Sequence, residues 1–213
     1  MRLDRSGWSW VIAVGIAVAA GCAGQPASSA SRAAPLPAAV DSGVAEQDLN
    51  QVGQAMRMLR DAQGGADLKG IHLVLHADVD HLASALAHID GGFQATVDAG
   101  QRRLDDLVRP AAMRTLRNQR RTCNQHDGDL RMAMESLLLC KQALAITVVD
   151  YQAQLNALIK SLDGALSLPA IRAADPIIGQ LLENESELRS VLIDVSAKSK
   201  AVSAALLSDE TPP

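Results

Sequence analysis

Aromatic side chains are nearly absent from this sequence of 213 residues. Only four occur, Trp8, Trp10, Phe93 and Tyr151, and they make up 2% of the chain. Clefts that stack on sugars and surfaces that stack on nucleic-acid bases are built mainly from such rings. We therefore expect no nucleic-acid partner. An apolar content of 48% nevertheless supplies a folded core, which excludes wholesale disorder.

Catalytic signatures are also missing from the sequence. It contains no GxSxG nucleophile elbow, no glycine-rich loop for a phosphate and no HExxH pair for a metal. No pair of carboxylates stands in a context that would form a cleft. We therefore expect a protein without enzymatic activity and without a cofactor.

The N-terminal segment has the pattern of an export signal. Arg2 and Arg5 precede an uncharged stretch from Trp8 to Gly21, which has 14 residues. A helix that crosses a bilayer needs roughly 20 residues. Basic residues followed by a short apolar run are typical of a cleaved signal peptide, so a permanent transmembrane helix is not expected here.

This segment ends in Ala19-Ala20-Gly21-Cys22, which resembles the lipobox of bacterial lipoproteins. The resemblance implies that residues 1–21 are removed and that Cys22 is acylated and anchors the chain to a membrane. Ala23 stands where an Asp retains lipoproteins in the inner membrane of enteric bacteria, so the resemblance implies the periplasmic face of the outer membrane. It covers only the first 22 residues and implies no activity. An ordinary signal peptide with a coincidental cysteine is the alternative.

Composition divides the rest of the chain into three parts. Residues 22–42, beginning with the lipidated cysteine, are almost all Ala, Ser, Pro and Gly and are expected to form a flexible tether. Residues 43–208 show no further shift in composition and are expected to form one domain. Residues 209–213 are expected to fray.

Apolar residues recur at helical spacing throughout residues 43–208, and no stretch alternates as a strand does. We predict an all-α fold, an elongated up-and-down helical bundle with coiled-coil-like packing. The apolar pattern of the first helix, which ends at Gly64-Gly65, consists of Val44, Leu49, Val52, Met56 and Leu59. The pattern of the second helix consists of Leu68, Leu75, Leu82 and Ile89, with His72, Val79, Leu86 and Phe93 beside them.

Several residues predict where the later helices begin, bend or end. Gly91-Gly92 predicts a kink or a short break, and Pro110 either begins a helix or bends one. Residues 124–128 are expected to connect two helices, the second of which covers residues 129–166 and carries Lys141 on its apolar seam as a register-setting polar position or a point where the bundle opens. Asp175 and Pro176 are expected to begin the last helix.

The two cysteines that remain after Cys22 are candidates for a disulfide bond. An even remainder in an exported protein favours a bond between Cys123 and Cys140. In a tight hairpin near residue 126, Cys140 would lie about 15 Å from the residue opposite Cys123. The bond is feasible if residues 124–128 run extended beside the helix, and two separate thiols are the alternative.

Four of the five histidines cluster in the segment HLVLHADVDHLASALAH. His72, His76 and Asp80 are spaced four residues apart and share one helical face, as metal ligands would. His81 and His88 form a second column, and either set could instead titrate between pH 6 and 7. The alternative is that these histidines are ordinary residues at the boundary of the apolar stripe.

A basic segment covers residues 102–121, where seven arginines stand against two aspartates. Three of the arginines share one helical face and predict a surface for anions or for an acidic partner. They are Arg114, Arg117 and Arg121. The alternative is neutralisation within the chain by an acidic edge on the last helix. This edge consists of Glu183, Glu185 and Glu187.

Taken together, these patterns predict a non-enzymatic lipoprotein of the bacterial cell envelope that is anchored to the membrane. Long amphipathic helices on a tether suit the binding of an envelope protein or of a second copy of the chain. The alternative is a metal-binding or pH-responsive lipoprotein that uses the histidines between His72 and His88.

Overall fold

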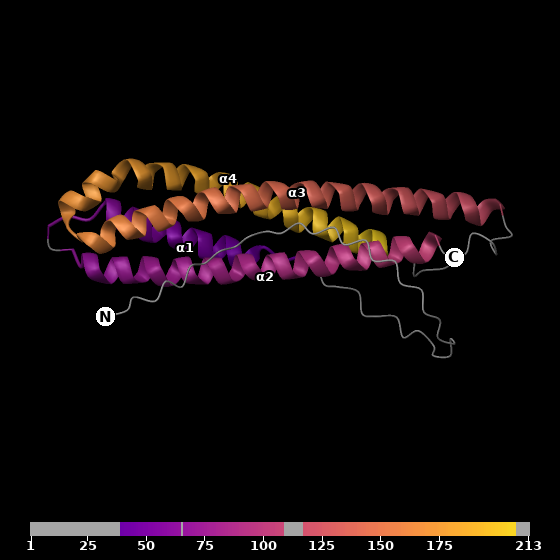
Figure 1. Ribbon diagram of the computed structural model, residues 1–213, viewed down its shortest axis with the longest axis horizontal. Helices are drawn as coiled ribbons and strands as arrows, with labels where there is room; N and C mark the ends of the chain where they lie inside the picture. The colour runs from indigo at the N-terminus through magenta and orange to yellow at the C-terminus, as the bar shows by residue number, and fades with distance from the viewer. Residues whose placement is uncertain (1–38, 65, 109–116, 208–213) are drawn as a thin grey trace, which may run out of the picture. The chain divides into compact units, whose positions relative to one another are not determined.

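The computed structural model describes residues 39–64, 66–108 and 117–207, without the side chains of 106–108 and 117–126. The described residues form four α-helices and no strand, which confirms the predicted all-α bundle (Figure 1). The helices are α1 (Gly43–Arg60), α2 (Leu68–Val108), α3 (Arg117–Gly164) and α4 (Leu168–Leu207).

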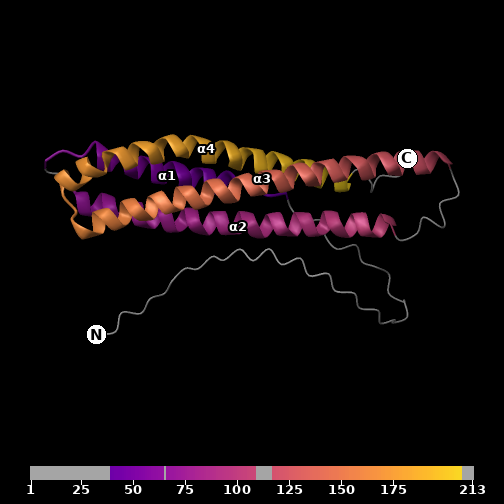
Figure 2. The same ribbon diagram turned by 45° about the horizontal axis from the view of Figure 1, so that its top comes forward.

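Successive helices run in opposite directions, and one of them is much shorter than the others. Helix α1 has 18 residues, whereas α3 has 48. At 1.5 Å per residue these helices are about 27 Å and 72 Å long. Figure 2 shows that α1 lies beside only one end of the bundle, against α2 and α4, while α3 and α4 pack together over much of their length.

The core is a continuous layer of aliphatic side chains with two aromatic rings. Phe93 of α2 and Tyr151 of α3 are almost completely buried. The fully buried aliphatic residues follow the helical spacing of the sequence, so each helix turns one stripe inward. They include Leu49, Met56, Leu59, Leu75, Leu82, Leu137, Leu155, Leu158, Leu162, Ile178, Leu181 and Leu192.

The last residues of the predicted tether pack on the bundle, contrary to the prediction that the tether extends to residue 42. Val40 is part of the core, and its backbone N–H donates a hydrogen bond to Ser199 Oγ of α4 at 2.8 Å. Ser42 is also buried, and its hydroxyl donates to the carboxylate of Glu46. In the first helix the core position next to Ser42 is Ala45, so the prediction that Val44 faces the core was wrong: Val44 is 63% exposed.

Helix α2 is not interrupted at Gly91-Gly92, where a kink or a short break was predicted. Gly92 accepts a hydrogen bond at its carbonyl from the Thr96 hydroxyl, 3.0 Å away, and a β-carbon at Gly92 would lie 3.5 Å from Val40. Each glycine costs a helix about 1 kcal/mol. Burial of Ile89 and Phe93 on either side outweighs that cost.

Helix α3 begins at Arg117 and continues through residues 124–128, which were predicted to connect two helices. That prediction was wrong because the cost of a single glycine and a few polar residues, about 1 kcal/mol for the glycine, is smaller than the contribution of packing along a long helix. Pro110 lies outside the described residues. At the predicted Lys141 seam position, Nζ forms an ion pair with Asp90 Oδ1 at 3.0 Å and lies 4.6 Å from the centre of the Phe93 ring. Lys141 therefore joins α3 to α2.

The last helix also begins earlier than predicted. Helix α4 starts at Leu168 and contains Pro176 in its interior, so Asp175 is not an N-cap. Proline removes one backbone hydrogen bond and bends a helix. Figure 1 shows α4 changing direction in its first third. Ala174 and Ile178 stay buried on either side of the bend, while Pro176 itself is exposed, so the core face continues across it.

Candidate functional site

Two of the predicted metal ligands come together in the structure, but with a different third residue. His72 and His76 lie one turn apart near the start of α2, and their rings meet edge to face with centroids 4.7 Å apart. Asp163, in the last turn of α3, lies beside both. The ligand atoms of these three residues are all within 4.8 Å of one another. We call them the His–His–Asp cluster.

One carboxylate oxygen of the His–His–Asp cluster lies close to both imidazoles. Asp163 Oδ1 lies 3.3 Å from His76 Nε2 and 3.5 Å from His72 Nε2. The contact with His76 is a hydrogen bond, whereas the contact with His72 is not. As a result, Nε2 of His72 is buried without a hydrogen-bond partner among the described residues.

Burial controls the charge of His72. The residue is 8% exposed, and burial lowers the pKa of its imidazole below the usual value. The neighbouring His76 lowers that pKa further, while Asp163 raises it. His72 is therefore neutral at neutral pH and keeps a free lone pair on one ring nitrogen.

The predicted ligand Asp80 does not belong to the cluster. It is exposed, and its backbone carbonyl accepts a hydrogen bond from the Ser84 hydroxyl at 2.9 Å. His81 and His88, the second predicted column, are exposed as well. The sequence missed Asp163 because it lies 87 positions from His76. Asp163 could have been found from its position at the end of a predicted helix, because that helix was expected to run antiparallel to the one that carries the histidines.

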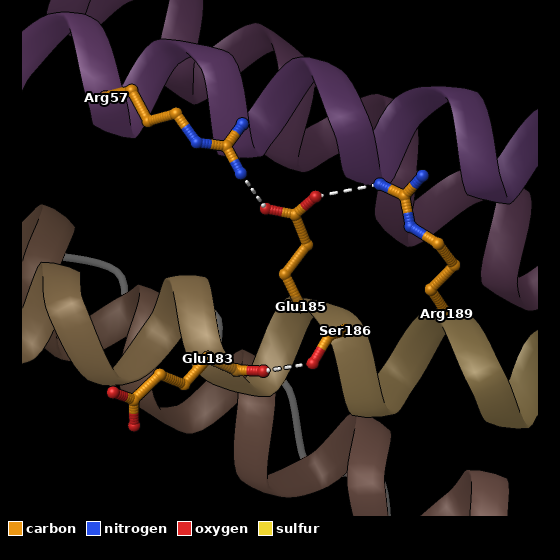
Figure 3. Close-up of polar contacts among 5 residues, drawn as sticks. All are labelled: Arg57, Glu183, Glu185, Ser186 and Arg189. Carbon is orange, nitrogen blue, oxygen red and sulfur yellow. Dashed lines mark hydrogen bonds and ion pairs between the residues drawn. The ribbon is translucent and has the colours of Figure 1, made fainter.

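A second polar cluster, which the sequence did not predict, lies between α1 and α4. Glu185 of α4 is buried, and its carboxylate accepts hydrogen bonds from two arginines (Figure 3). Arg57 of α1 donates from Nη2 to Oε2 at 3.0 Å, and Arg189 donates from Nη2 to Oε1 at 2.8 Å. A β-carbon at Gly53 would overlap the carboxylate, so the absence of a side chain there makes room for the ion pair.

This cluster corrects the prediction of an acidic edge formed by Glu183, Glu185 and Glu187. Glu183 points away from the arginines in Figure 3 and, like Glu187, is exposed, whereas Glu185 is inside the bundle. Burial raises the pKa of the nearby Tyr151 phenol, and the charge of Glu185 adds to that effect. The Tyr151 hydroxyl has no hydrogen-bond partner within the described part of the chain.

The outward face of α3 carries a stripe of exposed apolar residues. Met132, Leu139 and Ile146 follow one another at seven-residue intervals, and Val149 lies one turn after Ile146. Each of the four keeps more than half of its surface accessible. We call these four residues the α3 stripe. Buried positions such as Leu137 and Leu155 occupy the opposite side of the helix.

Two further observations concern the same part of α3. Among the described helices, α3 alone is long and apolar enough to cross a membrane by length and composition, and 11% of that apolar window is buried in the bundle. A groove of about 420 Å³ lies beside the stripe, between α3 and α4. Its lining includes Ile146, Asp150, Tyr151, Gln154, Asn184 and Glu187.

The predicted disulfide bond does not form within one chain. Cys123 and Cys140 lie on the same uninterrupted helix, 17 positions apart, which corresponds to about 25 Å along its axis. A disulfide needs α-carbons roughly 4.4–6.8 Å apart. Cys140 is a half-buried free thiol.

The other predicted site residues lie outside the described part of the chain. Arg114 and the lipidation residue Cys22 are not among the described residues, nor are the side chains of Arg117 and Arg121.

Comparison with known proteins finds no protein-family model, no curated protein and no solved structure that matches this chain.

Proposed function

We propose that the protein is a lipid-anchored, non-enzymatic module of the bacterial cell envelope that acts by self-association through the α3 stripe. The single observation that carries self-association is the stripe itself, because four large apolar side chains remain exposed on one face of a helix whose other face is already packed. The anchor and the envelope location rest on the lipobox resemblance that ends at Cys22. Contiguous apolar patches on a protein surface mark sites of interaction.

The spacing of the α3 stripe fits a partner helix. From Met132 to Ala153 the stripe and its alanine continuation follow a seven-residue repeat over about 33 Å. Between these positions, Ala143 lies four residues after Leu139, and Val149 lies three residues after Ile146. A seven-residue apolar repeat is the pattern by which two helices pack knobs into holes.

A second copy of the chain is a suitable occupant when its α3 runs antiparallel. Centred on Ile146, this arrangement places Leu139 opposite Ala153 and Asp150 opposite Gln142 of the second copy. A parallel arrangement would bring the two Asp150 carboxylates together. Like charges at facing positions destabilise an interface, so the antiparallel pairing is favoured.

The area available is adequate for a reversible dimer. The exposed surface of the α3 stripe is on the order of 450 Å² per chain, so two copies with their neighbouring alanines would bury about 1,000 Å², the lower limit for a specific interface. The predicted acyl anchor at Cys22 would add to this affinity, because confinement to one membrane raises the effective concentration of the copies.

Cysteine cross-linking in intact membranes tests the proposal. The full-length chain, with Cys123 and Cys140 changed to Ser and Cys22 retained, would carry either Ile146→Cys or Leu139→Cys. Oxidation should cross-link two copies through position 146 but not through position 139, since antiparallel packing separates the latter pair by about 21 Å. Leu73→Cys, at an exposed apolar position of α2, is the matched control.

One outcome would contradict the antiparallel orientation, and two would contradict self-association through the stripe. Cross-linking at both α3 positions would show a parallel pair. No cross-link at either, with both thiols reactive toward a water-soluble maleimide, would show that the stripe is free. No cross-link with both thiols shielded from that reagent would place the stripe against lipid or against a different protein. Release of the chain from membranes without detergent would refute the anchor separately.

A further inference from the structure

The geometry points to a binding site for a divalent transition metal of the zinc class, formed by His72, His76 and Asp163. Its ligands come from two helices, α2 and α3, at the end of the bundle where α2 begins and α3 ends (Figure 1). This inference does not depend on self-association, because the residues differ from those of the α3 stripe.

The measured separations match those of ligands around a tetrahedral zinc ion. Zinc binds imidazole nitrogen and carboxylate oxygen at about 2.0–2.1 Å, so neighbouring ligand atoms in a tetrahedron lie about 3.3–3.4 Å apart. Asp163 Oδ1 lies 3.3 Å from Nε2 of His76 and 3.5 Å from Nε2 of His72. Two of the three edges between ligands are therefore already in place.

The remaining edge, between the two imidazoles, closes with a small movement. All three ligand atoms lie within 4.8 Å of one another, so this edge must shorten by no more than about 1.4–1.5 Å to become tetrahedral. The side chain of His76 is 40% exposed and can rotate toward the metal, whereas buried His72 is held by its surroundings. The i, i+4 spacing already brings both rings to one face of α2.

An independent observation also indicates a ligand. The side chain of His72 is nine-tenths buried, and its Nε2 faces Asp163 without a hydrogen bond to any described residue. A buried polar atom without a partner costs free energy, and a metal ion at this position would provide the missing interaction. The lowered pKa of His72 keeps its imidazole neutral, which is the form that binds a metal.

The chemistry of the ligands selects the metal. Two imidazoles and one carboxylate suit zinc, nickel or copper, whereas calcium and magnesium prefer ligands that are all oxygen. The three protein ligands leave a fourth position for water. Asp163 is 54% exposed, so the site is open to solvent on that side.

The metal would stabilise the bundle by joining two helices. It would link α2 to the end of α3, a pair that packs together less extensively than α3 and α4 do. At a concentration 100-fold above the dissociation constant, such an ion should raise the melting temperature of a domain of this size by about 5–10 °C.

The experiment uses the full-length protein, purified in detergent, treated with a chelator and then titrated with ZnCl₂. Binding would be measured by calorimetry, and thermal unfolding would be followed by circular dichroism with and without the metal. CoCl₂ would serve as a spectroscopic probe, because its visible absorption reports tetrahedral coordination. We expect binding at micromolar zinc and an increase in melting temperature of at least 5 °C.

Matched variants identify the ligands. Asp163→Asn and His72→Gln should each weaken zinc binding at least tenfold and abolish the increase in melting temperature. Asp80→Asn and His88→Gln should change neither, because these residues are exposed and lie outside the His–His–Asp cluster. The melting temperature of each variant without metal shows whether it is folded.

Two results would overturn the inference. One is the absence of heat and of any shift in melting temperature at 100 µM zinc with a folded wild-type chain, a concentration about 100-fold above a micromolar dissociation constant. The other is loss of binding in Asp80→Asn together with full binding in Asp163→Asn. Either result would leave cross-linking through the α3 stripe unaffected, so the two proposals fail independently.

Discussion

Replacing Gly53 with alanine should destabilise the protein, although the same change elsewhere in a helix is stabilising. Alanine in place of glycine inside a helix gains about 1 kcal/mol in the free energy of unfolding. At Gly53 the added β-carbon would overlap the Glu185 carboxylate, which is held by Arg57 and Arg189. Moving the carboxylate sacrifices at least one charge-assisted hydrogen bond, at a cost of about 1.5–3 kcal/mol.

The net effect of Gly53→Ala is therefore a loss of about 0.5–2 kcal/mol. Gly91→Ala is the matched control, because a β-carbon at this helical position meets no atom within 4 Å. The control should gain up to about 1 kcal/mol. In a domain of this size, the melting temperatures of the two variants should differ by about 3–12 °C. Urea unfolding followed by circular dichroism gives the same comparison in free energy.

A double variant tests whether the Glu185 carboxylate causes the loss of stability in Gly53→Ala. When Glu185 is first changed to Ala, the β-carbon at Gly53 no longer meets a carboxylate, and Gly53→Ala should become as stabilising as Gly91→Ala. If Gly53→Ala is stabilising in the wild-type chain, or equally destabilising with and without Glu185, the close approach does not determine the stability of this interface.

Three further predictions concern other residues of the bundle. Tyr151→Phe should stabilise the protein by about 1 kcal/mol, because it removes a buried hydroxyl without a partner. It should also abolish a loss of stability above pH 10: the raised pKa of the folded phenol means that the unfolded chain ionises first, at a pKa of about 10. Urea unfolding of the wild-type chain and the variant at pH 7 and pH 10.5 measures both effects. If the free energy of unfolding falls by the same amount between the two pH values in both proteins, the second effect is contradicted. Lys141→Met should cost about 0.5–1.5 kcal/mol through loss of the ion pair with Asp90 and the contact with the neighbouring ring, whereas Lys141→Arg should cost less. Equal unfolding midpoints for the two variants would argue against this. Cys123 and Cys140 should both react with maleimide without prior reduction, and protection of both in a monomeric chain, measured by mass spectrometry, would show that they pair.

The fold was predictable because helical periodicity is a local property of the sequence. Leu75, Leu82 and Ile89 recur at intervals that place them on one face, and all three are buried. The short interruptions misled the prediction, because a glycine or a proline costs about 1–3 kcal/mol whereas packing along a whole helix contributes more. Helix α4 accordingly continues through Pro176, and α3 continues through residues 124–128.

The sites were only partly predictable, because they depend on contacts between distant segments. The i, i+4 pair of His72 and His76 is visible in the sequence, but Asp163 joins it only through the antiparallel packing of α2 and α3. The prediction that Glu185 lies on an exposed edge was wrong for the same reason. Its charge suggested an exposed edge, and nothing local indicates that Arg57 of α1 lies against it.

The short first helix determines how a pulling force would act on the bundle. The chain enters the described fold at residue 39 on the flank of α4, where Val40 is held by Ser199, and not at either tip of the long helices. Tension along the axis of α1 would make this helix slide past α2 and α4. All of its buried side chains would then have to leave their packed positions at the same time. A force across the axis would peel them away one turn at a time. The bundle should thus resist a lengthwise load better than a sideways one.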